Sequence, residues 1–256
     1  MRYFVHLSYN GAAYHGWQAQ ENAPSVQAEI EKCLGLKAKE TISLTGCGRT
    51  DTGVHARNFF AHFDSETQFT EHELVHLTEK VNAFLPPDIV IHHIWQVEND
   101  FHARFDAQKR TYHYYISQYK NPFRIADSYY IYGDLNVPLM QKAANMLFEY
   151  DDFTSFAKLH SQTRTNLCKI YAAHWFDENG MLIFRISANR FLRNMVRSIV
   201  GTLLEVGKGK LSLNDFRSII EAKDRCFAGF SAPAHALFLE EVVYEGINDA
   251  LGAIHN

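Results

Sequence analysis

Hydrophobic and polar residues alternate in the opening segment of the chain, as they do in a β-strand with one buried face. Tyr3, Val5, Leu7 and Tyr9 share that face, because successive side chains of a strand point to opposite sides. Similar alternation, or a short run rich in β-branched and aromatic residues, predicts further strands over residues 41–44, 54–63, 89–95, 110–116, 170–176, 182–187 and 237–244.

A second pattern places apolar residues three and four positions apart and predicts helices. The first helix begins after Ser25, a good N-cap, and its apolar face comprises Val26, Ile30, Cys33 and Leu34. A helix over 71–84 should end before Pro86 and Pro87. Further helices are predicted over residues 135–148, 191–205 and 213–221.

Strands and helices mix along the chain without a strict βαβ alternation. This order predicts an α+β fold with antiparallel sheets. The periodicity pauses near residues 100–108, which suggests a boundary between two domains. We therefore expect an N-terminal domain over 1–107 and a C-terminal domain over 108–256, a division that suits 256 residues.

The chain carries 25 Lys and Arg against 29 Asp and Glu, a formal net charge of −4, which excludes a uniformly basic nucleic-acid coat. The charge is uneven, however. Residues 62–100 hold eight acids against one lysine, whereas 101–124, 153–176 and 185–210 are net basic and rich in aromatic residues. Basic charge beside aromatic faces suits flipped or single-stranded bases, although exposed arginines beside core aromatics would give the same pattern.

The four cysteines form no C-x-x-C pair, so neither a disulfide framework nor a cysteine zinc site is expected. The N-terminus has no apolar signal region, and no run of 18 apolar residues occurs. These features favour a cytoplasmic protein without a membrane span.

Two short motifs suggest hydrolases. His72, Glu73 and His76 form H-E-x-x-H, which on a helix would offer two zinc ligands and a general base. The pattern has two free positions in a chain with 14 histidines, so an acidic surface helix with incidental histidines is the preferred interpretation. Asp51-Thr52-Gly53 matches the D-T-G of aspartic proteases, which need a second carboxylate; a polar hairpin turn is the simpler interpretation.

The segment from Gly46 to Gly53 carries more glycine than a turn requires. Glycine permits a close approach of the backbone to a ligand, and strands on either side would hold Asp51 rigidly. Arg49 stands two residues before Asp51 and could contact a phosphate while the carboxylate faces a sugar or base.

These residues belong to a larger set of motifs that resembles the TruA family of tRNA pseudouridine synthases. The central motif, G-R-T-D-x-G-V-H-A, runs from Gly48 to Ala56. Other matching blocks occur in family order, at Tyr9–Gln20, Ser25–Gln27, Asn82–Ile89, Phe101–Ala107, Lys109–Tyr114, Asp152–Phe156, Phe191–Arg197 and Ala232–Leu239. Arg57, Arg193 and Ala236 depart from the family's usual Gly, His and Gly.

The resemblance implies two ferredoxin-like α+β halves with a central RNA-binding cleft, and a homodimer that binds tRNA across both subunits. It implies isomerisation of uridine at positions 38–40 of the anticodon stem-loop, without cofactor or metal. Asp51 would be the catalytic carboxylate, Arg197 its cationic partner and Tyr112 the active-site tyrosine. Substrate-binding residues would be Arg49, Tyr112, Arg190 and Arg110.

The residues support these roles to different degrees. A carboxylate in a closed pocket needs a cation to remain ionised, and Arg197 is a suitable one. Arg190, Arg193 and Arg197 should follow one edge of the helix over 191–205, and Gly201 should allow close packing there. The sequence leaves open whether Asp51 attacks C1′, adds to C6 or removes a sugar proton.

A tRNA-binding protein or RNA chaperone without catalytic activity is the main alternative, because it would keep the basic segments. In either case the tRNA should avoid the acidic helix over 71–80 and enter from the side that carries Arg49, Arg110 and Arg197.

Overall fold

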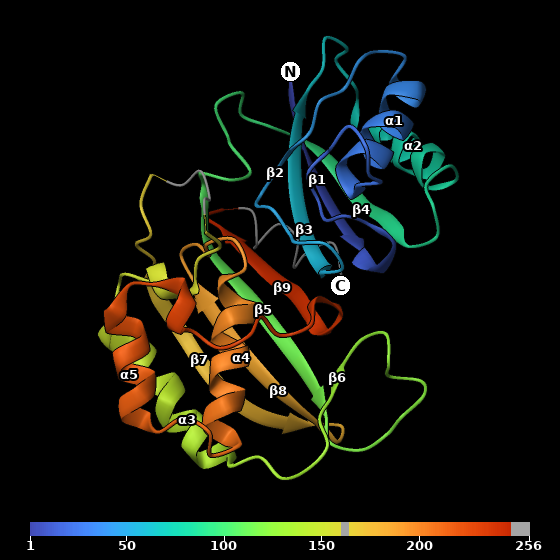
Figure 1. Ribbon diagram of the computed structural model, residues 1–256. Coiled ribbons are helices and arrows are strands. Elements are labelled where there is room, and N and C mark those ends of the chain that lie inside the picture. The colour runs from blue at the N-terminus through green and yellow to red at the C-terminus, as the bar shows by residue number, and fades with distance from the viewer. Residues whose placement is uncertain (160–163, 247–256) are drawn as a thin grey trace. The chain divides into compact units, whose positions relative to one another are not determined.

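The computed structural model describes residues 1–159 and 164–246, and the chain forms two compact units (Figure 1). Unit 1 comprises Met1–Gln108 together with the chain from Leu239 onward, and unit 2 comprises Lys109–Phe238. The last strand thus groups with the N-terminal part of the chain. The functional domains expected over 1–107 and 108–256 stay a prediction.

The sheet of unit 1 is antiparallel where its pairings are resolved. Its main strands follow the order β4-β1-β3-β9, and β2 pairs with β3. In register, Tyr3 of β1 lies opposite Phe63 of β3 and Gln96 of β4. The strands are β1 (Arg2–Tyr9), β2 (Thr45–Gly46), β3 (His55–Asp64), β4 (Ile89–Val97) and β9 (Leu237–Tyr244).

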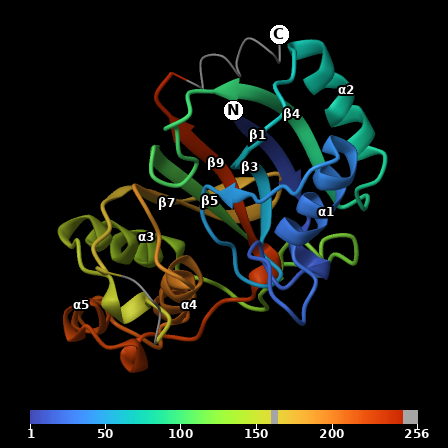
Figure 2. The same ribbon diagram turned by 90° about the horizontal axis from the view of Figure 1, so that it is seen from above.

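Two helices, α1 (Val26–Ala38) and α2 (Glu71–Asn82), lie together on unit 1, as Figures 1 and 2 both show. Ser25 caps α1 by accepting a hydrogen bond from the N–H of Ala28, as its position before the apolar pattern predicted. Thr70 and Glu73 form a reciprocal capping box at the start of α2.

Strand β1 is covered on both faces, not on one as the alternation predicted. Phe4 is fully buried although it faces away from Tyr3 and Val5. It packs edge-on against Tyr244 of β9 at 5.2 Å between ring centroids, and Phe60 packs against the same ring at 5.4 Å. The C-terminal strand therefore helps to cover this second face.

The main strands of unit 2 are also antiparallel, with β8 between β5 and β7. Tyr114 of β5 lies opposite Phe184 of β8, which lies opposite Trp175 of β7. The short strand β6 pairs with β5 in parallel. The strands are β5 (Ala107–Ser117), β6 (Tyr129–Tyr130), β7 (Ile170–Glu178) and β8 (Met181–Ala188). The first two residues of β5 belong to unit 1.

Three helices cover one face of this sheet: α3 (Val137–Met146), α4 (Met195–Gly207) and α5 (Leu213–Ala222) (Figures 1 and 2). Helix α4 is central, since all its residues except Arg197 and Glu205 are buried. Short 3₁₀ turns at Gly11–Ala13, Leu147–Glu149, Thr154–Phe156, Arg225–Phe227 and Ala234–Ala236 complete the described part of the chain. The predicted α+β class with antiparallel sheets is confirmed.

Two predicted elements differ from the structure. Residues 41–44 are not a strand, because side chains of α1 take the hydrogen bonds that a neighbouring strand would take. The N–H of Leu44 donates to Glu31 Oε1 at 2.7 Å, and its carbonyl accepts from Gln27 Nε2 at 3.0 Å.

The helix predicted over 191–205 begins four residues later, at Met195. Asn194 precedes it in the left-handed conformation, with φ of 66°, so the residues before Asn194 lie outside the helix. Arg190 and Arg193 therefore precede the helix, and the predicted edge of three arginines along it is wrong. In the described ranges, no helix is long and apolar enough to cross a membrane.

Candidate active site

The loop that carries Asp51 connects β2 to β3 in unit 1. Its two ends are fixed by backbone hydrogen bonds, from Cys47 N–H to the Phe60 carbonyl at 2.7 Å and from Val54 N–H to the Asp51 carbonyl at 3.1 Å. The Asp51 side chain is half-buried, whereas Arg49 is exposed. The loop thus presents a carboxylate from a fixed backbone with an exposed cation two residues away.

The segment after β1 packs backbone to backbone against this loop. A Cβ atom at Gly11 would lie 2.0 Å from the Val54 carbonyl oxygen, and one at Gly16 would lie 2.3 Å from that of Thr50. Gly16 also has a φ of +91°, which disfavours any other residue. Only glycine allows these approaches, so the glycines of the N-terminal motif hold the Asp51 loop in place.

Hydrogen bonds from the same segment hold the residues on both sides of Asp51. The hydroxyl groups of Tyr9 and Thr50 are 2.8 Å apart in a buried contact. The Tyr14 carbonyl accepts from Gly53 N–H at 3.3 Å, and the Tyr14 hydroxyl donates to Asp88 Oδ1 at 2.7 Å. Burial and this carboxylate raise the pKa of Tyr14, so its hydroxyl stays a donor at neutral pH.

A buried aromatic stack contacts the loop that carries Asp51. Trp17 is 1% exposed and stacks on Phe59 of β3 at 4.1 Å between ring centroids. The backbone N–H of Trp17 donates to the Thr50 carbonyl at 3.3 Å. The conformation of the Asp51 loop is therefore set by β3, by the N-terminal motif and by the aromatic core together.

In unit 2, Tyr112 lies on β5 opposite Ile186 of β8 and is half-buried. Its ring meets that of Phe191 edge-on, at 5.2 Å and 87°. Phe191 comes from the segment between β8 and α4, so this segment fixes one side of the Tyr112 ring.

Arg197 lies in the first turn of α4 and is one of the two residues of that helix that are not buried. Its Nε donates to the Ala232 carbonyl at 2.7 Å, and the Ala232 N–H donates to the Arg197 carbonyl at 3.0 Å. The next residue, Pro233, accepts from the buried hydroxyl of Tyr114 at 3.0 Å. Burial raises the pKa of Tyr114, so this hydroxyl stays protonated.

The remaining predicted arginines of unit 2 meet at one end of its sheet. Arg110 Nη1 donates to the carbonyl of Asn189 at 2.7 Å, and the N–H of Arg190 donates to Asn189 Oδ1 at 2.9 Å. Both arginines are half-buried. The structure therefore brings Arg110 and Arg190 together through a residue to which the sequence analysis gave no role.

The chain was compared with known proteins. A family model described as a tRNA pseudouridine synthase matches residues 143–245. The tRNA pseudouridine synthase A of Azobacteroides pseudotrichonymphae is 51% identical over 243 residues, which cover 95% of this chain and 96% of that protein. Its counterpart from Porphyromonas gingivalis is 51% identical over 245 residues, covering 95% and 97%, and that from Clostridium acetobutylicum is 41% identical over 240 residues, covering 93% and 97%.

The chain belongs to the tRNA pseudouridine synthase A family. The similarity spans nearly the whole chain, so the resemblance seen in the motifs is confirmed. The roles of individual residues remain predictions.

Membership of the tRNA pseudouridine synthase A family leaves the H-E-x-x-H motif without a catalytic role. His72 and His76 do lie on one face of α2, with ring centroids 4.4 Å apart, and His76 contacts Glu79. Among residues 1–159 and 164–246, however, no group of three or more His, Cys, Asp or Glu side chains could hold a metal ion. The motif is part of an acidic surface helix.

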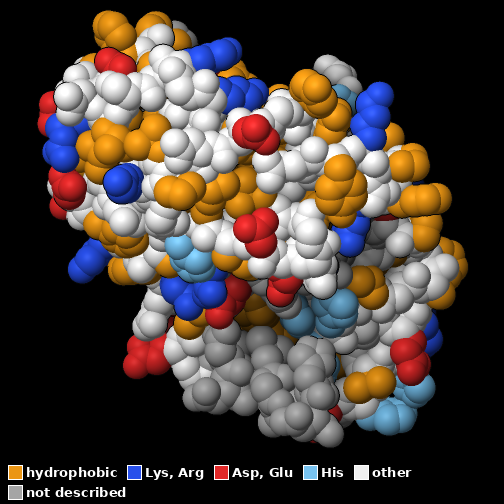
Figure 3. Space-filling view, turned by 90° about the horizontal axis from the view of Figure 1, so that it is seen from below, with side chains coloured by type: hydrophobic (Ala, Val, Ile, Leu, Met, Phe, Trp, Pro, Cys, Tyr) orange, Lys and Arg blue, Asp and Glu red, His pale blue; other side chains and the backbone are white. Residues whose placement is uncertain are grey.

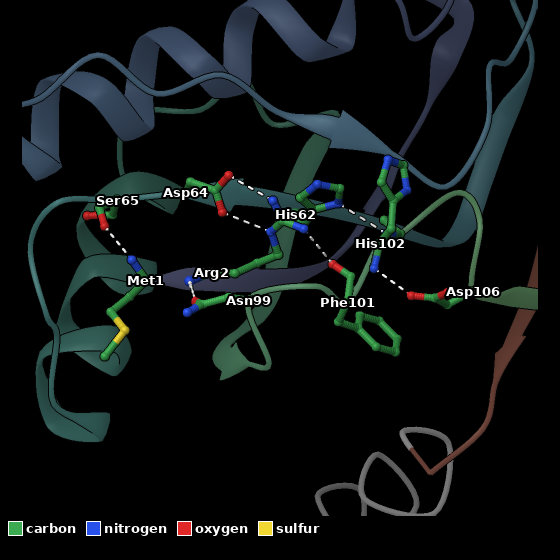
Figure 4. Close-up of polar contacts among 10 residues, drawn as sticks. Met1, Arg2, His62, Asp64, Ser65, Asn99, Phe101, His102 and Asp106 are labelled. Atoms are coloured by element: carbon green, nitrogen blue, oxygen red, sulfur yellow. Dashed lines mark hydrogen bonds and ion pairs between the residues drawn. The ribbon is translucent and has the colours of Figure 1, made fainter.

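A separate polar cluster of unit 1 contains none of the predicted site residues of this synthase family (Figure 4). Arg2 of β1 donates to both oxygens of Asp64, at 2.8 and 2.9 Å, and to the Phe101 carbonyl at 3.0 Å. His62 Nδ1 accepts from the N–H of Ala103 at 3.1 Å. Burial, with the nearby Arg2, lowers the pKa of His62 to about 4, so the ring is a neutral acceptor.

A surface hollow of about 410 Å³ lies beside this cluster, lined by Phe101, Phe105, Asp106, Gln108 and Glu245. It too contains none of the predicted site residues, although Phe101, Phe105 and Asp106 belong to the motif block Phe101–Ala107. Side chains of both charges are interspersed with hydrophobic and uncharged ones on the face shown in Figure 3. This face is therefore not uniformly basic, as the net charge of the chain predicted.

The sequence analysis missed the residues that hold the candidate arginines of unit 2. Asn189 could have been suspected, because a polar residue that directly follows a strand and precedes Arg190 often makes a turn contact. Ala232 belongs to the motif block Ala232–Leu239, but the sequence indicated no contact between it and Arg197, because its backbone and not its side chain holds the guanidinium.

Proposed function

We propose that this chain isomerises uridine to pseudouridine at positions 38–40 in the anticodon stem-loop of tRNA. The observation that carries the proposal is the similarity to tRNA pseudouridine synthase A proteins over 95% of the chain. The braced Asp51 loop supports it, because it presents one carboxylate from a backbone held by Gly11 and Gly16.

The reaction is an isomerisation and needs no oxidant or reductant. The N1–C1′ bond of the nucleotide breaks, the uracil turns, and C5 joins C1′. The C5 proton leaves, and N1 carries a proton in the product, so the atoms of substrate and product balance. We assign to Asp51 the role of the carboxylate that acts on the sugar or base during these steps.

Tyr112 and Arg197 complete the proposed catalytic set. A half-buried carboxylate remains ionised more readily beside a cation, and Arg197 supplies a guanidinium that is held by Ala232. Tyr112 can stack on the flipped uracil, and its hydroxyl can assist removal of the C5 proton. Its edge-on contact with Phe191 supports this role, because it restricts the ring.

The predicted RNA contacts are Arg49, Arg110 and Arg190. Arg49 is exposed beside Asp51, where it can bind a phosphate or fill the space that the flipped base leaves. Arg110 and Arg190 add cations at the end of the unit 2 sheet.

The family resemblance also supports a cytoplasmic homodimer that binds tRNA across both subunits. Sedimentation of the purified protein with and without tRNA tests the dimer. A mass of one chain at the concentrations used for activity would contradict it.

The decisive experiment replaces one carboxylate. Asp51→Asn should abolish pseudouridine formation on an unmodified tRNA transcript, as mapped at positions 38–40. Asp134→Asn, an exposed position of unit 2, makes the same chemical change and should leave the yield unchanged. A near-normal yield from Asp51→Asn would refute the assignment.

The same assay addresses the alternative of a tRNA-binding protein without catalytic activity. Such a protein would leave all uridines unmodified even as the wild type, while binding the transcript tightly. Pseudouridine in the wild-type reaction, lost in Asp51→Asn with binding retained, excludes this alternative.

A further inference from the structure

One end of the unit 2 sheet gathers three basic residues. Arg110 of β5 and Ile170 of β7 both lie opposite Ala188, the last residue of β8. Lys169 directly precedes Ile170, and Arg190 follows two residues after Ala188. Three adjacent strands therefore bring cations to the same sheet end, although these residues are far apart in sequence.

Asn189 connects all three segments. Its Oδ1 accepts from the N–H of Lys169 at 2.8 Å and from the N–H of Arg190 at 2.9 Å. Its own N–H donates to the Lys169 carbonyl at 3.1 Å, and its carbonyl accepts from Arg110 Nη1 at 2.7 Å. One half-buried residue thus fixes two backbone segments and one guanidinium.

The choice of an amide at this position has an electrostatic consequence. An aspartate has nearly the same shape and would accept the same two N–H groups. Its negative charge, however, would stand beside Arg110 and Arg190 and would attract their guanidinium groups, which could then neutralise fewer phosphates. A neutral acceptor holds the backbone and adds no negative charge beside the two arginines.

We propose that Asn189 is a positioning residue for tRNA binding, which holds Arg110 and Arg190 toward the phosphate backbone without neutralising them. The proposal rests on the proposed function only in taking tRNA as the ligand. Asn189 itself touches no reacting atom in this account.

The test compares two variants that make the same chemical change. Asn189→Asp keeps the oxygen that accepts from the two N–H groups and adds one negative charge. Asn136→Asp does the same at the N-cap of α3, where Asn136 Oδ1 accepts from the N–H of Leu139 at 3.0 Å and Asp is an equally good cap. The salt dependence of binding to a tRNA transcript is measured for both and for the wild type.

For Asn189→Asp, we expect a shallower plot of the logarithm of the tRNA association constant against the logarithm of the salt concentration. The magnitude of its slope should be smaller than in the wild type by about 1 to 2, as expected for the loss of one or two phosphate contacts. Asn136→Asp should retain the wild-type slope. Thermal unfolding should show that Asn189→Asp is folded, since the backbone hydrogen bonds remain. Equal slopes for the two variants would show that Asn189 is merely structural and would overturn the proposal.

Two further variants keep the test valid if Asn189→Asp does not fold. Arg110→Gln and Arg190→Gln should each reduce the salt slope by about 1. Unchanged slopes in both would show that there is nothing at this sheet end for Asn189 to position. Direct binding is measured throughout, so a wild type that forms no pseudouridine would refute the proposed function and leave this result standing.

Discussion

Arg197 and Ala232 hold each other through two hydrogen bonds. The Arg197 Nε donates to the Ala232 carbonyl at 2.7 Å, and the Ala232 N–H donates to the Arg197 carbonyl at 3.0 Å. The segment Phe230–Pro233 therefore restricts the guanidinium and also packs against α4. An arginine that is fixed at Nε has a restricted set of orientations.

Replacing Arg197 should impair catalysis more than tRNA binding. We expect Arg197→Met to lower kcat by about 100-fold or more, with a small change in KM, because the lost interaction acts mainly in the transition state. Single-turnover kinetics and direct tRNA binding measure the two effects. Arg217→Met, which removes an exposed pair with Glu149, is the control. Equal losses of rate and affinity would make Arg197 a phosphate contact instead.

The buried contact between Tyr9 and Thr50 should be coupled to activity. Tyr9→Phe and Thr50→Val each leave one hydroxyl without its partner at 2.8 Å, so each should lower stability and kcat. The double variant should lose less than the sum of both, with a coupling energy of about 1 kcal/mol in thermal unfolding. Strictly additive effects on both measurements would show that this contact does not support the Asp51 loop.

Gly201 should tolerate no larger residue. A Cβ there would lie 1.8 Å from the Phe230 carbonyl oxygen, so Gly201→Ala should destabilise the protein by about 2 kcal/mol despite its better helix propensity. Gly207→Ala at the C-terminal end of α4 would clash with the flexible Met140 side chain, at 2.4 Å, while Leu135 at 3.5 Å is an ordinary contact, so this variant should cost less. Chemical denaturation compares the two variants. If Gly201→Ala is as stable as the wild type, the segment Phe230–Pro233 does not pack closely against α4.

His62 should make the protein sensitive to acid. Its pKa is about 4 in the folded protein, lowered by burial, whereas an unfolded histidine takes up a proton near pH 6.5. The stability contributed by neutral His62 is therefore complete above pH 6.5 and is lost as the pH falls from 6.5 to 4. The loss should amount to about 2 to 3 kcal/mol.

The measurement is the free energy of unfolding across that pH range. His62→Asn keeps an acceptor for the Ala103 N–H but does not titrate, so it should flatten the slope between pH 6.5 and 4. His72→Asn on the exposed face of α2 is the matched control and should leave the slope as it is. A steep slope that persists in His62→Asn would assign the acid sensitivity to other groups.

Local patterns in the sequence predicted most elements of the fold. Ser25 marked the start of α1 correctly, because an N-cap is a local interaction between a side chain and the next turn. Residues 41–44 were predicted wrongly because Leu44 bonds to Gln27 and Glu31 of α1, which periodicity along the chain does not reveal. The start of α4 was predicted four residues too early for a different reason. Asn194 has a left-handed backbone, which a pattern of apolar residues does not reveal.

The candidate residues that the sequence singles out are those that would act through their own side chains. Asp51 stood out because glycines surround it, and the family motifs indicated Tyr112 and Arg197. The residues that hold these groups were not predictable, since Ala232 acts through its backbone and Asn189 joins strands that are distant in sequence. Those relationships exist only once the sheet has formed.

Strand β9 has a consequence for how the protein is made. Tyr244 is 2% exposed, packs against Phe4 and Phe60, and donates from its hydroxyl to the Ala103 carbonyl at 2.6 Å. Unit 1 therefore takes part of its core from a strand that follows unit 2 in the chain. The ribosome must synthesise all of unit 2 before the core of unit 1 can be completed, so unit 1 cannot finish folding while unit 2 is still being made.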